Sequence, residues 1–223
     1  MATGRRGRSA AAAAAAAAAR IALGGTAWGR YAGRMGQAAA SPYVRFEDYF
    51  EAEVTCAEDA PRHEWFDGVI YAMSRGTPEH GRLTSRMTVV LGNALPADCQ
   101  LYSGDTMLYI EPAKLATYAD AIVVCGPLAT ETVRKNGKSL GRAVTNPTII
   151  VEILSDSTER YDRDGKFQAY KELPSLREYV LVSQDRRQLE VFRRSRTWAG
   201  EVAVAGQDIL VHGVSVSVDA VYR

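Results

Sequence analysis

The stretch TIIVEIL, from Thr148 to Leu154, decides the fold, because it is a continuous apolar and β-branched run with one acid at its centre. Such a run predicts an interior strand that is covered on both faces. The acid, Glu152, is the exception, since an isolated buried carboxylate is costly unless a proton, a cation or a metal ion compensates its charge. We expect Glu152 to serve a site, and the alternative is a core acid that an Arg or Lys neutralises.

A second acid precedes another apolar run. Asp120 stands directly before Ala121–Val124, at the mouth of a predicted strand. Two carboxylates at neighbouring strand ends would offer the oxygen ligands that a hard divalent cation prefers. The alternative for Asp120 is a residue that caps a turn.

A predicted helix follows the Glu152 strand. Ser155–Thr158 supplies capping residues, and Asp162, Lys166 and Tyr170 then recur every four residues, on one stripe of the helix. We expect Asp162 to pair with Lys166 at this spacing and Tyr170 to pack in the core. For Lys166 the alternative is a solvated helix residue.

These motifs together resemble the Uma family of restriction endonucleases, which belongs to the PD-(D/E)XK nuclease superfamily. The likeness depends on their order and spacing and extends from about Tyr43 to the C-terminus. It is carried by Tyr118-Ala119-Asp120, Glu152–Thr158, Asp162-x3-Lys166-x3-Tyr170, Glu178–Val182, Arg62–Gly68 and Thr77–His80.

The resemblance implies an α/β (α+β) fold with a restriction-endonuclease-like core, in which helices flank a central mixed β-sheet. Residues 43–223 would form this nuclease domain. It also implies a divalent-metal-dependent endonuclease that hydrolyses DNA phosphodiester bonds, with the possibility of a homodimer that cuts both strands. Periodicity alone predicts only one α/β or α+β domain.

Phosphodiester hydrolysis requires a cation that neutralises developing charge and a positioned, activated water. The resemblance assigns Mg²⁺ or Mn²⁺ to Asp120, Glu152 and the backbone carbonyl of Ile153. Lys166 would orient the attacking water and stabilise charge in the transition state. Glu64 matches an upstream acid of the family and would hold a metal-bound water or a second ion.

Two positions depart from the superfamily pattern. The lysine that usually stands two residues after the second acid is replaced by Leu154, and the usual proline before the first acid is replaced by Ala119. Lys166 can serve in place of that lysine only if its helix packs over the end of the sheet.

Several further polar residues are weaker candidates. His80 could act as a base or contact phosphate, or could simply be hydrogen-bonded near a helix start. Asp105 is expected on the polar face of a strand. The segment Arg134–Arg142 is predicted to be a basic, Gly-containing loop, in which Arg134, Lys135 and Lys138 are the phosphate-contact candidates.

The remaining pattern predicts alternating helices and strands. A short amphipathic helix is expected from Phe46 and a longer one from Pro78, with a hairpin at Asp67-Gly68 between them. The other predicted strands are Leu101–Ile110, Tyr118–Cys125, Glu178–Val182, Gln188–Arg194, Trp198–Val204 and Val214–Val218. Arg193, Arg194 and Arg196 are expected at a solvated edge.

Composition indicates one sizeable soluble domain, since 47% of the 223 residues are hydrophobic and 24% are charged. The first 46 residues contain seven arginines and no acid, so the rest holds 20 basic and 26 acidic residues, a net charge of −6. Such a body needs basic patches or a bound cation to attract nucleic acid. Cys56, Cys99 and Cys125 lack Cys-x-x-Cys spacing, which argues against zinc and a disulfide framework and favours a reducing cytoplasm.

Residues 1–42 are rich in Ala, Gly and Arg and are predicted to be a disordered, low-complexity tail outside the fold. A transit peptide and an export signal are two explanations of this composition. The favoured one is a start codon assigned too far upstream, with Met35 as the true beginning.

Two other functions compete with the endonuclease. A catalytically silent module that binds nucleic acid or protein on the same fold would explain the acidic body and Leu154. A metal-dependent phosphoesterase with another substrate would use the same residues.

Overall fold

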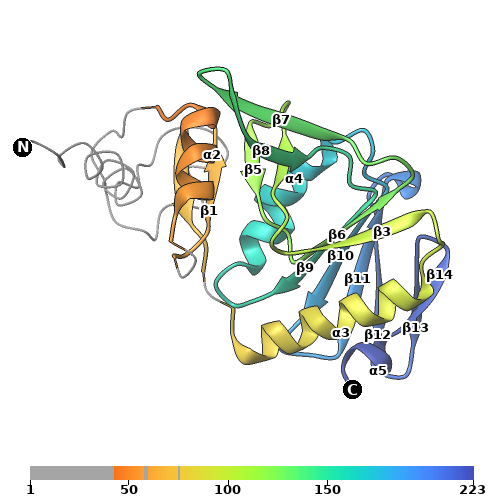
Figure 1. Cartoon of the computed structure of the whole chain (residues 1–223). Coiled ribbons are helices and arrows are strands. Elements are labelled where there is room, and N and C mark those ends of the chain that lie inside the picture. Colours follow the sequence, from red (N-terminus) through yellow and green to blue (C-terminus); the bar gives the residue numbers. More distant parts are fainter. Residues whose placement is uncertain (1–42, 58–59, 75) are drawn as a thin grey trace, which may run out of the picture. The chain divides into compact units, whose positions relative to one another are not determined.

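The computed structural model describes residues 43–57, 60–74 and 76–223 (Figure 1). The predicted tail, residues 1–42, lies outside the described residues. The chain divides into two compact units. The first contains the described residues up to Met73 together with 133–141, and the second contains 74–132 and 142–223.

A helix and a hairpin make up most of the first unit. Helix α2 (Phe46–Thr55) is followed by strands β1 (His63–Phe66) and β2 (Val69–Ala72), which pair antiparallel. The predicted Asp67-Gly68 turn is confirmed, with φ angles of 41° and 85° that suit this residue pair. The helix packs through aromatic rings, and those of Phe46 and Trp65 lie 5.4 Å apart.

The predicted basic loop at Arg134–Arg142 is wrong, because this segment forms a hairpin. Strands β7 (Thr130–Lys135) and β8 (Lys138–Val144) are neighbours in a sheet and are joined by Asn136-Gly137. The φ angles of 50° and 78° at this pair are those that an Asn-Gly hairpin turn requires. The basic residues and the glycine of this segment favour a loop, but the Asn-Gly pair is a hairpin-turn signal and decides the structure.

A six-stranded mixed sheet forms the centre of the second unit. Strand β9 (Ile149–Leu154) is entirely buried and lies inside it, parallel to β10 (Glu178–Ser183) and antiparallel to β6 (Ala121–Cys125). This confirms the interior strand predicted around Glu152. The full order is β12 (Gly200–Val204), β11 (Gln188–Arg193), β10, β9, β6 and β3 (Cys99–Ser103).

Helices cover both faces of this sheet, as expected for the mixed α/β fold (Figure 1). Alternate residues of β9, namely Ile149, Val151 and Ile153, pack with the buried face of α3 (Pro78–Ala94). The same core takes in the hairpin β13 (Asp208–Val211) and β14 (Val214–Ser217), together with α5 (Val218–Val221). The opposite face carries η3 (Tyr161–Lys166) and α4 (Phe167–Lys171). Because side chains alternate along a strand, Glu152 points toward η3 and α4.

Two predicted strands differ most in their bounds, whereas the others agree to within two residues at each end. Leu101–Ile110 is not one strand, because Gly104-Asp105 makes a turn between β3 and β4 (Leu108–Ile110). Asp105 is exposed in this turn, not on a strand. The strand predicted from Tyr118 begins only at Ala121, after β5 (Leu115–Thr117), which pairs antiparallel with β4.

The expectation that the cysteines form no disulfide is also wrong. Cys99 and Cys125 are bonded to each other across β3 and β6, whose register places the two residues opposite one another. They are 26 positions apart in the sequence, so only the pairing of these strands brings them together. Cys56 is exposed and unbonded.

Candidate active site

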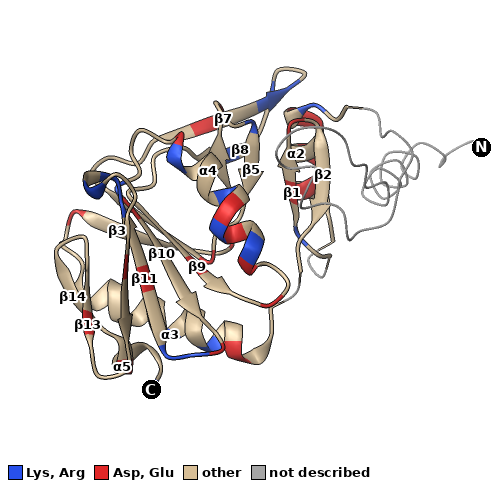
Figure 2. Cartoon of the chain, turned by 180° about the vertical axis from the view of Figure 1, so that it is seen from behind, with Lys and Arg blue, Asp and Glu red and all other residues tan. Residues whose placement is uncertain are grey.

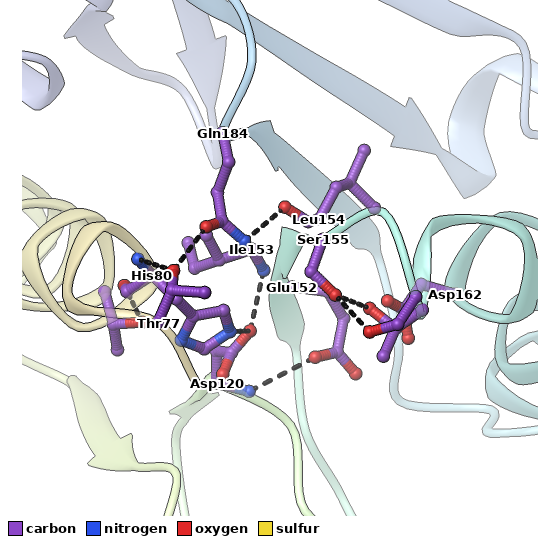
Figure 3. Close-up of polar contacts among 12 residues, drawn as sticks. Thr77, His80, Asp120, Glu152, Ile153, Leu154, Ser155, Asp162 and Gln184 are labelled. Atoms are coloured by element: carbon purple, nitrogen blue, oxygen red, sulfur yellow. Dashed lines mark hydrogen bonds and ion pairs between the residues drawn. The ribbon is translucent and has the colours of Figure 1, made fainter. Parts of the chain in front are cut away.

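Two carboxylates meet where β6 begins and β9 ends. Asp120 precedes β6 and lies across from Glu152, since the antiparallel register pairs Ala121 with Val151. The backbone N–H of Asp120 donates a hydrogen bond to Glu152 Oε2 at 3.3 Å. The Asp120 carboxylate in turn accepts one from the backbone N–H of Ile153 at 2.7 Å. Figure 3 shows both carboxylates on this edge of the sheet.

The helix brings a cation and a hydroxyl to the same carboxylate. Lys166 Nζ lies 3.3 Å from Glu152 Oε1, and the Tyr170 hydroxyl donates to that oxygen at 2.7 Å. Lys166 also lies 3.5 Å from Asp162 Oδ1, as the spacing of four predicted. Glu152, Lys166 and Asp162 are 3%, 5% and 3% exposed, so these charges interact in a medium that screens them weakly.

The beginning of this helix departs from α geometry. Residues Tyr161–Lys166 form a π-helical turn before α4. π-helical turns are rare in proteins overall, but those that occur are often found at functional sites. Acidic and basic residues alternate along it (Figure 2), and the buried ones, Asp162 and Lys166, are those on the Glu152 side.

A second set of contacts reaches Asp120 from helix α3. His80 Nε2 lies 3.2 Å from Asp120 Oδ2. Thr77 caps the helix by accepting a hydrogen bond from the His80 backbone N–H, and its own hydroxyl donates to Gln184 Oε1 at 2.8 Å. Gln184 Nε2 then donates to the carbonyl of Leu154 at 2.6 Å. The start of α3 is thereby tied to the ends of β9 and β10 (Figure 3).

Burial and charge shift the proton affinities at this site. The pKa of Glu152 is raised well above its usual value of 4.5, chiefly because burial disfavours the charged form. Lys166 and the Tyr170 hydroxyl oppose this rise, whereas Asp162 and Asp120 add to it. The hydrogen bond to Asp120 raises the pKa of His80 above 6.5. Three carboxyl groups, those of Asp120, Glu152 and Asp162, therefore interact at this site with one lysine and one histidine.

Within the second unit, the structure brings together four of the predicted site residues, Asp120, Glu152, Lys166 and His80. Glu64, which is predicted to support them, is a buried residue of β1 in the first unit. The three predicted phosphate contacts lie near the Asn-Gly turn of the β7–β8 hairpin. Among them, Arg134 and Lys138 are exposed, and Lys135 is bound by Asp48 at 2.7 Å and Glu51 at 2.6 Å.

Two residues of the site were missed from the sequence. Gln184 follows a strand and carries no pattern that would single it out. Thr77 precedes Pro78, which is a signal for a helix N-cap but gives no indication of the bond to Gln184.

Among the residues that the structure describes, no helix is long and apolar enough to cross a membrane.

The chain is similar to two uncharacterized proteins of Synechocystis sp. (strain ATCC 27184 / PCC 6803 / Kazusa). It is 32% identical to slr1290 over 191 residues, which cover 83% of this chain and 95% of that protein. It is 27% identical to sll1609 over 154 residues, which cover 68% of this chain and 82% of that protein.

A similar fold occurs in a crystal structure from Anabaena variabilis ATCC 29413, described as "a putative nuclease belonging to DUF820". The TM-score is 0.60 at 16% sequence identity, and the likeness covers 78% of this chain and 96% of that one. At this identity the likeness shows the fold, a restriction-endonuclease-like core. Residues 46–219 match the Uma2 family, described as "Putative restriction endonuclease". Since this match spans most of the chain, the protein belongs to the Uma2 family.

Proposed function

We propose that this protein is a divalent-cation-dependent endonuclease that hydrolyses DNA phosphodiester bonds. The observation that supports this best is the convergence of Asp120, Glu152 and Lys166 within hydrogen-bonding distances at one edge of the central sheet. Two carboxylates and an ammonium group are the residue types that phosphodiester hydrolysis needs for cation binding and for water positioning.

The charge of the site fits a cation such as Mg²⁺ or Mn²⁺. Glu152 and Asp162 pair with the ammonium group of Lys166, and Asp120, which lies beside Glu152, pairs with the imidazole of His80. The pKa of Glu152 is raised because burial and the other two acids oppose its ionisation. A divalent cation would supply the missing positive charge and keep this carboxylate ionised.

Three oxygen donors would hold the cation. Asp120 and Glu152 provide carboxylate oxygens, and the Ile153 carbonyl provides the third. The backbone N–H of Ile153 points toward Asp120. Because the N–H and C=O groups of one strand residue face the same neighbouring strand, the Ile153 carbonyl is turned toward Asp120 as well. Mg²⁺ retains several waters and needs few protein ligands. When bound, the cation would neutralise developing charge on the phosphate oxygens and lower the pKa of a bound water.

The remaining side chains position these groups. Lys166 would orient the attacking water and stabilise the negative charge that develops during hydrolysis. The Tyr170 hydroxyl fixes one oxygen of Glu152, and His80 fixes one oxygen of Asp120. Lys166 would take the place of the superfamily lysine. That lysine would stand at position 154, which is two residues after Glu152 and therefore on the same face of β9, and Lys166 approaches Glu152 on this face.

Residues outside this group would support cation binding and DNA binding. Glu64 would hold a metal-bound water or a second ion. Arg134 and Lys138, being exposed, would contact phosphates, whereas Lys135 would first have to leave Asp48 and Glu51. A homodimer would cut both DNA strands.

Conversion of supercoiled plasmid to nicked circles tests the proposal. We expect nicking with Mg²⁺ or Mn²⁺ that stops with chelator. Asp120→Asn and Glu152→Gln should each lower the rate by about 100-fold or more while far-UV circular dichroism is retained, since each removes a cation ligand. The matched control is Glu131→Gln, which changes an exposed acid on β7 and should leave the rate unchanged.

Two results would contradict the assignment. Equal nicking by wild type and both site variants would place the chemistry elsewhere. DNA binding that is indifferent to cation and chelator, with no cleavage of plasmid, single-stranded DNA or RNA, would instead favour the silent binding module.

A further inference from the structure

A second group of ligand-type side chains lies at the end of β6 that is remote from Asp120. Cys125 ends β6, Cys99 begins β3, and His212 lies in the turn between β13 and β14. His212 Nε2 lies 3.6 Å from Cys125 Sγ. The ligand atoms of the three residues all lie within 4.8 Å of one another. A disulfide alone needs no imidazole, so the position of His212 calls for an explanation.

The backbone of the turn that carries His212 is bonded to a buried ion pair. His212 has a φ of 52°, and its backbone N–H donates to Glu178 Oε2 at 2.7 Å. The other oxygen of Glu178 pairs with Arg193 Nε at 3.2 Å, and both side chains are buried. Arg193 was expected at a solvated edge, which is wrong, because it also binds the carbonyl of Leu210 in the same hairpin. The turn that carries His212 is therefore fixed to the sheet.

One of the ligand spacings already agrees with tetrahedral zinc coordination. With Zn–S about 2.3 Å and Zn–N about 2.0–2.1 Å, a tetrahedral site separates S from N by about 3.5 Å and S from S by about 3.8 Å. The 3.6 Å between Cys125 Sγ and His212 Nε2 already meets the first condition. The second requires that the disulfide be opened, after which the sulfur atoms of Cys99 and Cys125 can separate by side-chain rotation.

We propose that Cys99, Cys125 and His212 form a redox-gated Zn²⁺ site, distinct from the carboxylate site. A dithiol reductant reduces the disulfide with two electrons and becomes a disulfide itself, leaving two protein thiols. Zn²⁺ then binds both sulfurs and the imidazole, and the two thiol protons are released. Thiolate and imidazole ligands select Zn²⁺, whereas the carboxylate oxygens of Asp120 and Glu152 suit Mg²⁺. Oxidation of the two thiolates by a disulfide compound restores the bond and releases the ion.

Co²⁺ serves as the spectroscopic probe, because only thiolate ligands give sulfur-to-cobalt charge-transfer absorption. The full chain would carry Cys56→Ser, which removes the exposed unbonded thiol. After reduction by a phosphine, we expect one equivalent of Co²⁺ to produce this absorption and Zn²⁺ to displace it. The oxidised protein should give none. Mass spectrometry with a thiol-alkylating reagent would verify the number of thiols in each state.

Ligand variants assign the site. Cys99→Ser leaves one thiolate and should weaken the band by about half or more, and His212→Ala, which keeps both cysteines, should weaken Co²⁺ binding at least about 10-fold. Absence of the absorption in the reduced Cys56→Ser protein would overturn the proposal and leave Cys99–Cys125 as a structural disulfide. Unchanged Co²⁺ affinity in His212→Ala would equally overturn it. Neither result depends on nuclease activity, so each is independent of the function proposed above.

Discussion

The raised pKa of Glu152 predicts that this residue contributes less to the stability of the cation-free protein as pH rises. Below pH 4.5, its usual value, this carboxyl is protonated in both the folded and the unfolded chain. Between pH 4.5 and the raised pKa, the folded chain keeps a proton that the unfolded chain has lost. The contribution of Glu152 to the free energy of unfolding then falls with pH, by at most about 1.4 kcal/mol per pH unit, or about 3 kcal/mol over two units.

Glu152→Gln isolates this contribution. The amide oxygen of Gln can still accept from Tyr170, and the side chain has no proton to lose. We therefore compare the free energies of unfolding of the two proteins in the presence of chelator. The value for wild type minus the value for Glu152→Gln should decline above pH 4.5. Urea unfolding followed by circular dichroism at a series of pH values would measure this difference. The matched control is Glu131→Gln, which makes the same substitution at an exposed acid on β7.

Mg²⁺ or Mn²⁺ should reverse the decline in wild type only. The cation takes the place of the proton on Glu152, and a ligand that binds only the folded state stabilises it. If the free energies of unfolding of wild type and Glu152→Gln in chelator change with pH in parallel, the inference that the buried Glu152 carboxyl is protonated is wrong. A decline in wild type that persists at saturating Mg²⁺ and Mn²⁺ would refute Glu152 as a cation ligand.

Two further predictions concern the helix that faces Glu152. Lys166→Met should lower the nicking rate by about 100-fold or more. Adding Leu154→Lys to this variant should raise the rate again by at least about 10-fold, because residues 154 and 166 face the same carboxylate. A double variant that folds but shows no such increase would contradict the equivalence of the two positions. Tyr170→Phe should lower the free energy of unfolding by about 1–3 kcal/mol, since a buried carboxylate oxygen loses its donor. It should also raise the pKa of Glu152 further, because the Tyr170 hydroxyl lowers it, and a pH curve identical to that of wild type would contradict this.

Local patterns were sufficient for much of the fold. The apolar run around Glu152 predicted the interior strand β9, the Asp67-Gly68 pair predicted the hairpin of β1 and β2, and Pro78 marked the start of α3. These signals succeed because they concern neighbours in sequence, whose backbone preferences and burial are set within one element. Two wrong predictions lie at Gly104-Asp105 and Asn136-Gly137, where the backbone turns and the turn residues outweigh the surrounding strand and charge patterns.

The sequence by itself determined which residues were chemically unusual, namely an acid in a buried strand, another at a strand mouth, and a stripe of Asp162, Lys166 and Tyr170. Only the tertiary structure decided how these residues meet. Strand order and register bring Asp120 to Glu152 and Cys99 to Cys125, and the packing of η3 and α4 on the sheet brings Lys166 to Glu152. Contacts between residues 14 to 33 positions apart, as in this carboxylate site, depend on how whole elements pair, and no local pattern encodes that pairing.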